Sequence, residues 1–60
     1  MYCTLKMEME NAAFEHNGHE VARIMRKLAN DLEVYDILKS YKEVLFDING
    51  NSVGTFKVHK

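Results

Sequence analysis

The strongest constraint on the fold is a pair of alternating runs near the C-terminus, separated by Asn-Gly-Asn. Residues 41–48 and 52–58 both alternate between apolar and polar side chains, which is typical of strands with one buried face. Asn49, Gly50 and Asn51 favour a tight turn, because glycine and asparagine tolerate left-handed backbone conformations. The sequence therefore predicts a β-hairpin over about residues 41–58.

The length of the hairpin loop decides which side chains share a face. A three-residue loop over residues 49–51 places Phe46 opposite Gly54 and Val44 opposite Phe56, and a five-residue loop has the same parity. Two- and four-residue loops would put Val44 and Phe56 on opposite faces, so we expect the odd-length loop. The expected inward residues are Val44, Phe46, Ile48, Gly54, Phe56 and Val58. The expected outward residues are Leu45, Asp47, Val53, Thr55, Lys57 and His59.

The N-terminal run "YCTLKMEME" also alternates and predicts a strand over about residues 2–10. The side expected to face the core carries Cys3, Leu5, Met7 and Met9. The following "NAAFEHNG" is expected to be irregular, with Phe14 folding beneath the next element.

Apolar side chains at three- and four-residue steps predict a helix over about residues 18–34. Asn17 is the expected N-cap, and Glu20 completes a capping box. The C-terminal end is poorly marked and is expected between residues 33 and 40. The expected core stripe consists of Val21, Ile24, Met25, Leu28, Leu32 and Tyr35.

These elements predict one α+β domain over residues 1–60, with a single helix on one face of a three-stranded, mostly antiparallel sheet. The favoured strand order is first–third–second, because every neighbouring pair is then antiparallel. The alternative order, with the first strand beside the second, requires a parallel pair. A chain of 60 residues is near the lower limit for independent folding, so modest stability is expected unless copies associate.

Composition argues against several classes of function. The formal net charge of −1 gives no bulk attraction to nucleic acid or to an anionic membrane. No stretch approaches the roughly 18 apolar residues of a membrane span, so no membrane partner is expected. Cys3 is the only cysteine, which excludes an internal disulfide and fits a cytoplasmic location.

Residues able to carry chemistry are few. His16 and His19 form an H-x-x-H with Glu20 beside them, but the spacing and the helix N-terminus disfavour a metal ion. Cys3 is expected to be an inert, buried thiol rather than a nucleophile. No metal site, no cofactor and no enzymatic activity are therefore expected, and His59 and the other histidines are expected to be solvated.

Two surfaces are candidates for binding a partner. The outward sheet face is expected to present Tyr2, Lys6, Leu45, Val53, Thr55 and Lys57, a mixed patch suited to a protein. The outer side of the helix presents the basic strip Arg23, Arg26 and Lys27, joined by Lys39 and Lys42. Ordinary solvated surfaces would explain both sets as well.

The segments "NAAFEHNGHEVARIMRKLANDLE" and "DINGNSVGTFKV" resemble a group of very small open reading frames common in bacteriophage and prophage genomes. The shared marks are "NAAF" after the first strand, the "EVARI…L" helix and the "D-x-NGN-x-VG" hairpin. The resemblance implies a phage origin, and no catalytic residues carry over from it to this chain. It implies a protein that binds and blocks a host protein, such as a component of CRISPR or another defence system.

The leading hypothesis is therefore a non-enzymatic, phage-derived module that occludes a host protein through its sheet face or a free strand edge. Pairing of free edges would also allow a homodimer. The alternatives are a small nucleic-acid-binding regulator that uses its sheet face and a virion assembly component.

Overall fold

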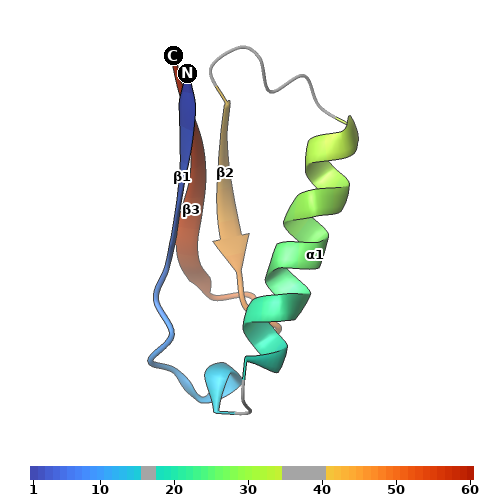
Figure 1. The fold of residues 1–60 in the computed structure, drawn as a ribbon. Coiled ribbons are helices and arrows are strands. Elements are labelled where there is room, and N and C mark those ends of the chain that lie inside the picture. The colour runs from blue at the N-terminus through green and yellow to red at the C-terminus, as the bar shows by residue number, and fades with distance from the viewer. Residues whose placement is uncertain (16–17, 35–40) are drawn as a thin grey trace.

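The structure is a computed structural model that describes residues 1–15, 18–34 and 41–60. Strand β1 (Tyr2–Met7) is followed by a 3-10 turn (Ala12–Phe14), helix α1 (His19–Val34) and strands β2 (Tyr41–Phe46) and β3 (Ser52–His59). The sheet order is β1-β3-β2 and both pairings are antiparallel, which confirms the favoured topology. Helix α1 packs against one face of the sheet (Figure 1). The predicted cap Asn17 and the predicted helix end beyond residue 34 lie outside the described residues.

The core is formed by one stripe of α1 and by the C-terminal hairpin. Ile24 and Leu28 project from the helix onto the sheet, as the helical periodicity predicts. Phe14 is half-buried against this cluster, which confirms its predicted position. The sheet contributes Leu45, Val53, Phe56 and Val58, and the core margin contains Met7, Leu32 and Tyr41.

The predicted hairpin register is wrong beyond the turn. The loop has five residues, 47–51, so Phe46 lies opposite Ser52 with the expected parity. The register then shifts between Leu45 and Phe46, so that Leu45 lies opposite Gly54. Val53 is the extra residue of this β-bulge. Beyond a bulge, each residue of one strand lies opposite a residue whose side chain would otherwise point to the other face of the sheet.

Because of the bulge, several side chains of the hairpin that were expected to be exposed are buried, and the reverse. Leu45 and Val53, which we expected on the outward face, are 3% and 5% exposed and belong to the core. Val44 and Phe46, which we expected inside, are 41% and 52% exposed. Ile48, in the loop, is also exposed. The inward assignment of Phe56 and Val58 in β3 is correct.

Gly54 lies where the backbone of β1 leaves no room for a side chain on β3. A Cβ atom at this position would collide with the carbonyl oxygen of Lys6 and lie 2.9 Å from the Cα atom of Met7. Because the obstacle is backbone, a side chain cannot simply rotate away. Glycine is therefore required by the packing of the strands.

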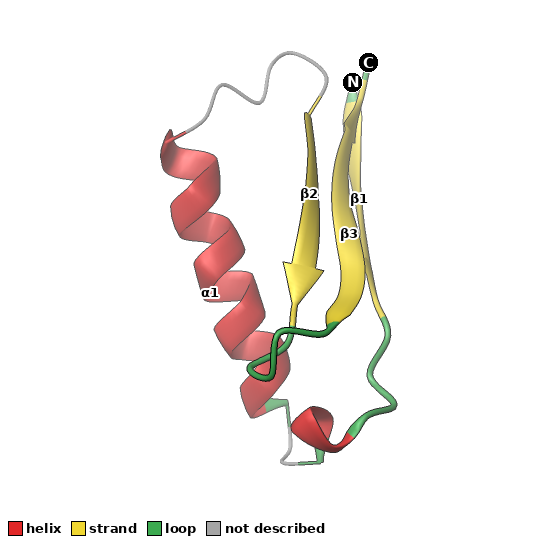
Figure 2. Cartoon of the chain, turned by 180° about the vertical axis from the view of Figure 1, so that it is seen from behind, coloured by secondary structure: helices red, strands yellow, loops and turns green. Residues whose placement is uncertain are grey.

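Strand β1 is barely covered by the helix. A helix is about 10 Å wide and strands lie about 4.8 Å apart, so one helix covers about two strands. Helix α1 packs over β2 and β3, and β1 lies at the far edge of the sheet (Figure 2). Cys3 and Leu5 lie on the helix side of the sheet, opposite the buried Val58 and Phe56. Cys3 and Leu5 are nevertheless exposed, and so is Met9, which lies beyond the strand. The prediction that they are buried is wrong for these three residues.

Within the described residues, no helix is both long and apolar enough to cross a membrane.

Candidate functional site

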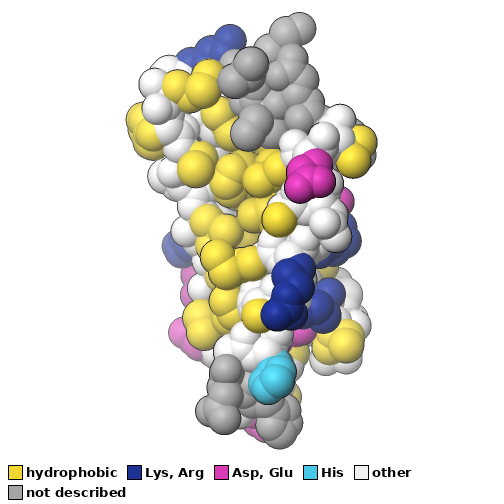
Figure 3. Space-filling model, turned by 45° about the vertical axis from the view of Figure 1, so that its right-hand side comes forward, with side chains coloured by type: hydrophobic (Ala, Val, Ile, Leu, Met, Phe, Trp, Pro, Cys, Tyr) yellow, Lys and Arg dark blue, Asp and Glu magenta, His cyan; other side chains and the backbone are white. Residues whose placement is uncertain are grey.

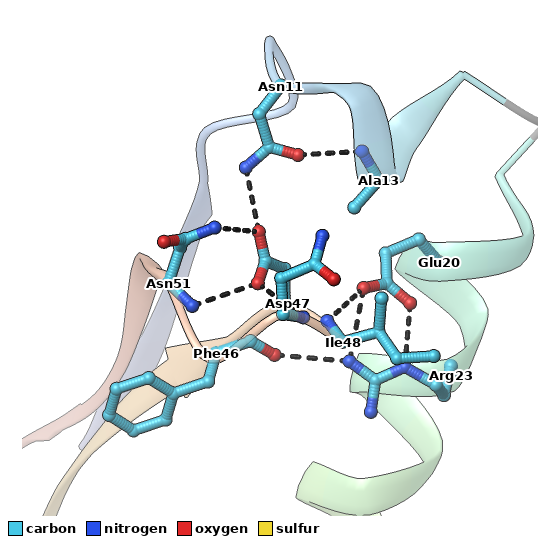
Figure 4. A network of polar contacts seen from close by, with 9 residues as sticks. Asn11, Ala13, Glu20, Arg23, Phe46, Asp47, Ile48 and Asn51 are labelled. Atoms are coloured by element: carbon cyan, nitrogen blue, oxygen red, sulfur yellow. Dashed lines mark hydrogen bonds and ion pairs between the residues drawn. The ribbon is translucent and has the colours of Figure 1, made fainter.

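Asp47 is the centre of a polar network at the hairpin turn (Figure 4). Its Oδ1 atom accepts hydrogen bonds from the backbone N–H groups of Asn49 and Asn51, both at 2.9 Å. Its Oδ2 atom accepts from the side-chain amides of Asn51 at 3.0 Å and Asn11 at 2.9 Å. Burial by itself would raise the pKa of Asp47, but these hydrogen bonds outweigh it and hold the pKa below its ordinary value.

A second part of the network joins α1 to the same turn. Arg23 donates from Nε to Oε1 of Glu20 at 2.6 Å and from Nη2 to the carbonyl oxygen of Phe46 at 3.2 Å. The backbone N–H of Ile48 donates to Oε2 of Glu20 at 2.6 Å. The hydrogen bond from Arg23, followed by that from Ile48, lowers the pKa of Glu20 despite its burial. Helix and hairpin are thus joined by charge-assisted bonds.

This network joins residues from three segments of the sequence. Asn11 begins "NAAF", Glu20 and Arg23 belong to the "EVARI" segment, and Asp47 and Asn51 belong to the hairpin motif. Every buried side-chain nitrogen and oxygen in the described part of the chain has a hydrogen-bond partner. The network therefore ties three segments of the fold together.

Residues considered for chemistry are dispersed. No three histidine, cysteine, aspartate or glutamate residues among those described lie close enough together to hold a metal ion. His19 is exposed, His16 lies outside the described residues, and Cys3 is an exposed thiol rather than the buried one expected. A hollow of about 30 Å³ between α1 and β2 has room for only one or two water molecules.

The sheet side opposite α1 is the main exposed surface of the hairpin and β1. We name it the open face. It consists of Tyr2, Thr4, Lys6, Lys42, Val44, Phe46, Thr55, Lys57 and His59.

Two lysines lie directly opposite each other on the open face. The register pairs Lys42 with Lys57, and both side chains are exposed. Like charges in directly opposite positions of a sheet are unfavourable. Neither lysine has a hydrogen bond or ion pair within the described segments, whereas Lys6 lies 3.6 Å from Glu8. The lysine pair is therefore an uncompensated positive site.

Apolar and aromatic groups lie beside this pair. Val44 follows Lys42 on the same face of β2, and Phe46 follows Val44. At the other end of the sheet, the Tyr2 ring stacks on the His59 ring with centroids 4.5 Å apart. Thr4 is hydrogen bonded to His59 at 3.1 Å. The open face thus combines positive charge with exposed apolar area.

The residues predicted to bind a partner have different positions. Tyr2, Lys6, Thr55 and Lys57 lie together on the open face, whereas Leu45 and Val53 are buried. Arg26 and Lys27 are exposed on α1, and Lys27 pairs with Asp31 at 3.0 Å. Arg23 of that basic strip bonds to the hairpin instead, and Lys39 lies outside the described residues.

Sequence reasoning missed Lys42, Val44 and Phe46 as members of the open face. It placed Lys42 with the helix and the other two in the core. The available signal was Gly54 beside Val53, because a glycine inside a strand often marks a bulge.

Comparison with protein-family models, with curated proteins and with solved structures gives no significant match to the chain.

Proposed function

We propose that this protein is a non-enzymatic binding module that occludes an acidic surface of another protein through its open face. The observation that carries the proposal is the uncompensated pair Lys42–Lys57 beside the exposed Val44 and Phe46. A partner carboxylate between the two lysines would relieve their mutual repulsion. Phe46 would enter an apolar depression of the partner, since buried aromatic side chains supply much of the binding energy of interfaces.

The resemblance to phage open reading frames indicates the class of partner. A phage-encoded module of this size would act in the cytoplasm of the infected cell, on a host protein such as a defence component. Occlusion requires only a complementary surface, which fits a chain in which the hollow between α1 and β2 measures only about 30 Å³. An acidic patch on the host protein, around an apolar centre, is the proposed target.

The test begins with affinity capture from host extract and identification of the partner by mass spectrometry. Binding is then measured for the wild type, for Lys42→Glu with Lys57→Glu, and for Phe46→Ser. We expect the double charge reversal to weaken binding at least 100-fold and Phe46→Ser at least tenfold, because each removes central contacts. The matched control is Arg26→Glu, on the exposed side of α1, which should change binding less than twofold. The proposal would be contradicted if Arg26→Glu strongly weakened partner binding and the double lysine variant left it unchanged.

Nucleic acid is the second candidate ligand, because the same lysines and aromatic rings could contact phosphates and bases. The net charge of −1 opposes this candidate. Titration with single- and double-stranded DNA at several salt concentrations separates the two. A nucleic-acid binder would show affinity that falls steeply with salt, and Lys42→Glu with Lys57→Glu would flatten that dependence.

A further inference from the structure

We infer that two copies of this chain pair through the outer edge of β1, forming a two-fold symmetric dimer with a continuous six-stranded sheet. This inference goes beyond the proposed binding function. It concerns the edge of the sheet formed by β1, on the other side from β2, and its partner is a second copy of the chain. It rests on the difference between the two sheet edges, on the direction of the backbone groups of β1 and on the surface area of the chain.

The two edges of the sheet are treated differently by the fold. At the β2 edge, Arg23 donates to the carbonyl oxygen of Phe46, and Glu20 accepts from the N–H of Ile48 just beyond the strand. These helix side chains occupy two backbone groups at the turn end of the β2 edge, where another strand would have to pair. At the β1 edge, no described residue bonds to the outward backbone groups. Unprotected edges are the places where strands of separate chains pair.

The backbone groups of β1 that point outward can be identified from its pairing with β3. The N–H of Glu8 donates to the carbonyl oxygen of Val53 at 2.6 Å, in register with the strand pairs before it. In an antiparallel ladder, alternate residues direct both backbone groups to the same neighbour. Even-numbered residues of β1 therefore bond to β3, and Cys3, Leu5 and Met7 direct their N–H and C=O groups to the free edge.

One register satisfies these groups with the most bonds. Two-fold pairing centred on Leu5 places Leu5 opposite Leu5 and Cys3 opposite Met7, so all three outward residues of each copy exchange hydrogen bonds. Lys6 then lies opposite Thr4 of the second copy. Centring on Lys6 would instead place Lys6 opposite Lys6, which like charges disfavour. In the register centred on Leu5, apolar side chains of both copies meet on the helix side of the sheet.

The apolar surface beside β1 supports association. Figure 3 shows a band of hydrophobic side chains running along the molecule between the helix and the sheet. Leu5 is 40% exposed and Met25, on α1, is also exposed. The edge that would pair therefore borders an apolar surface that a single helix leaves uncovered.

The accessible surface of the chain is larger than that of a typical monomer of its mass. The chain exposes 4540 Å², whereas a monomeric protein of its 7.0 kDa mass exposes about 4,000 Å². The chain therefore exposes about 500 Å² more than an average monomer of its mass, and a specific interface would bury about 1,000 Å² in total from two copies. The radius of gyration is 12.0 Å, against about 10.4 Å for a compact chain of this length.

The test measures mass against concentration by sedimentation equilibrium, for the wild type, Leu5→Lys and the control Val44→Lys. We expect the wild type to reach twice its 7.0 kDa mass in the micromolar to millimolar range. Leu5→Lys places two charges opposite each other and should raise the dissociation constant at least tenfold. Val44→Lys, equally exposed but on the open face of β2, should change it less than twofold. A wild type that stays monomeric to millimolar concentration, or grows beyond a dimer, overturns the inference.

Amide hydrogen exchange of the wild-type chain tests the paired edge without any substitution. We expect the amides of Cys3, Leu5 and Met7 to become protected at least tenfold as concentration rises through the dimer range. Those of Thr4 and Lys6, which bond to β3, should be protected at every concentration. Unchanged exchange of the three outward amides in a sample that is dimeric by mass would show that β1 is not the contact and would overturn the inference.

Discussion

Asp47 illustrates how one side chain can decide the shape of a hairpin. It accepts hydrogen bonds from Asn11, Asn49 and Asn51, and it thereby joins the loop before α1 to the turn between β2 and β3. Only an ionised carboxylate accepts at both oxygens without donating, so the network favours the charged form. The "D-x-NGN" motif is thus explained by turn structure.

The signs of the pKa shifts predict acid sensitivity. The pKa values of Asp47 and Glu20 are lower in the folded chain than their ordinary values near 4. Both carboxylates therefore stabilise the fold above about pH 4, and this stabilisation is lost as the pH falls through their lowered pKa values. The pKa of Glu43 is raised, by burial and then by its hydrogen bond with Asp31, despite the opposing bond from Tyr41. The contribution of Glu43 is therefore present at low pH and lost as pH rises through its raised pKa.

We expect Asp47→Asn to lower the free energy of unfolding at pH 7 and to reduce its dependence on pH below 5. The new amide would present a donor to the donating amides of Asn11 or Asn51, leaving one bond unmade. Urea unfolding between pH 3 and pH 7 measures both effects. Glu43→Gln is the opposite control and should stabilise the chain at pH 7. Equal pH dependence in wild type and Asp47→Asn would show that Asp47 is not the acid-sensitive group.

At the scale of elements, the predictable parts are those set by local pattern. The three-to-four residue spacing predicts α1 and the burial of Ile24 and Leu28, and the structure has both. Met25, which was expected in the same buried stripe, is exposed. Antiparallel pairing of every neighbour predicts the order β1-β3-β2, which is confirmed. These features follow from periodicity and chain connectivity alone, so a single sequence is sufficient for them.

The faces of β2 could not be predicted, because they depend on one inserted residue. Alternation fits Val44 and Phe46 inside as well as it fits Leu45 inside, since all three are apolar. The choice is made by the bulge at Val53, where tertiary packing overrides the simple register. The candidate site was therefore half predicted: Tyr2, Lys6, Thr55 and Lys57 are on the open face, and its apolar members were missed.

The contact between β1 and β3 yields a second prediction. We expect Gly54→Ala to lower the free energy of unfolding by about 1–3 kcal/mol, because the added methyl group meets the backbone of β1. The matched variant is Gly50→Asn, at a turn position with φ of +83° and open space around it. Asparagine tolerates that conformation, so little change is expected. Denaturant unfolding compares them, and equal stability of Gly54→Ala and wild type would contradict the close strand approach.

At the scale of the whole molecule, one helix is too narrow for three strands. The fold places α1 over the hairpin and leaves β1 exposed on its helix side. No described helix covers the opposite side of the sheet. A chain of 60 residues thus has two surfaces available for association, the open face with its lysine pair and the edge of β1.

The open face depends on which side chains of β2 point inward, and a pair of alanine variants measures this directly. In equilibrium unfolding, we expect Leu45→Ala to lose about 2–4 kcal/mol, because it leaves a cavity in the core. Phe46→Ala removes a side chain that is 52% exposed and should lose less than about 1 kcal/mol. The opposite ranking, with Phe46→Ala the more damaging, would place Phe46 in the core and contradict the open face.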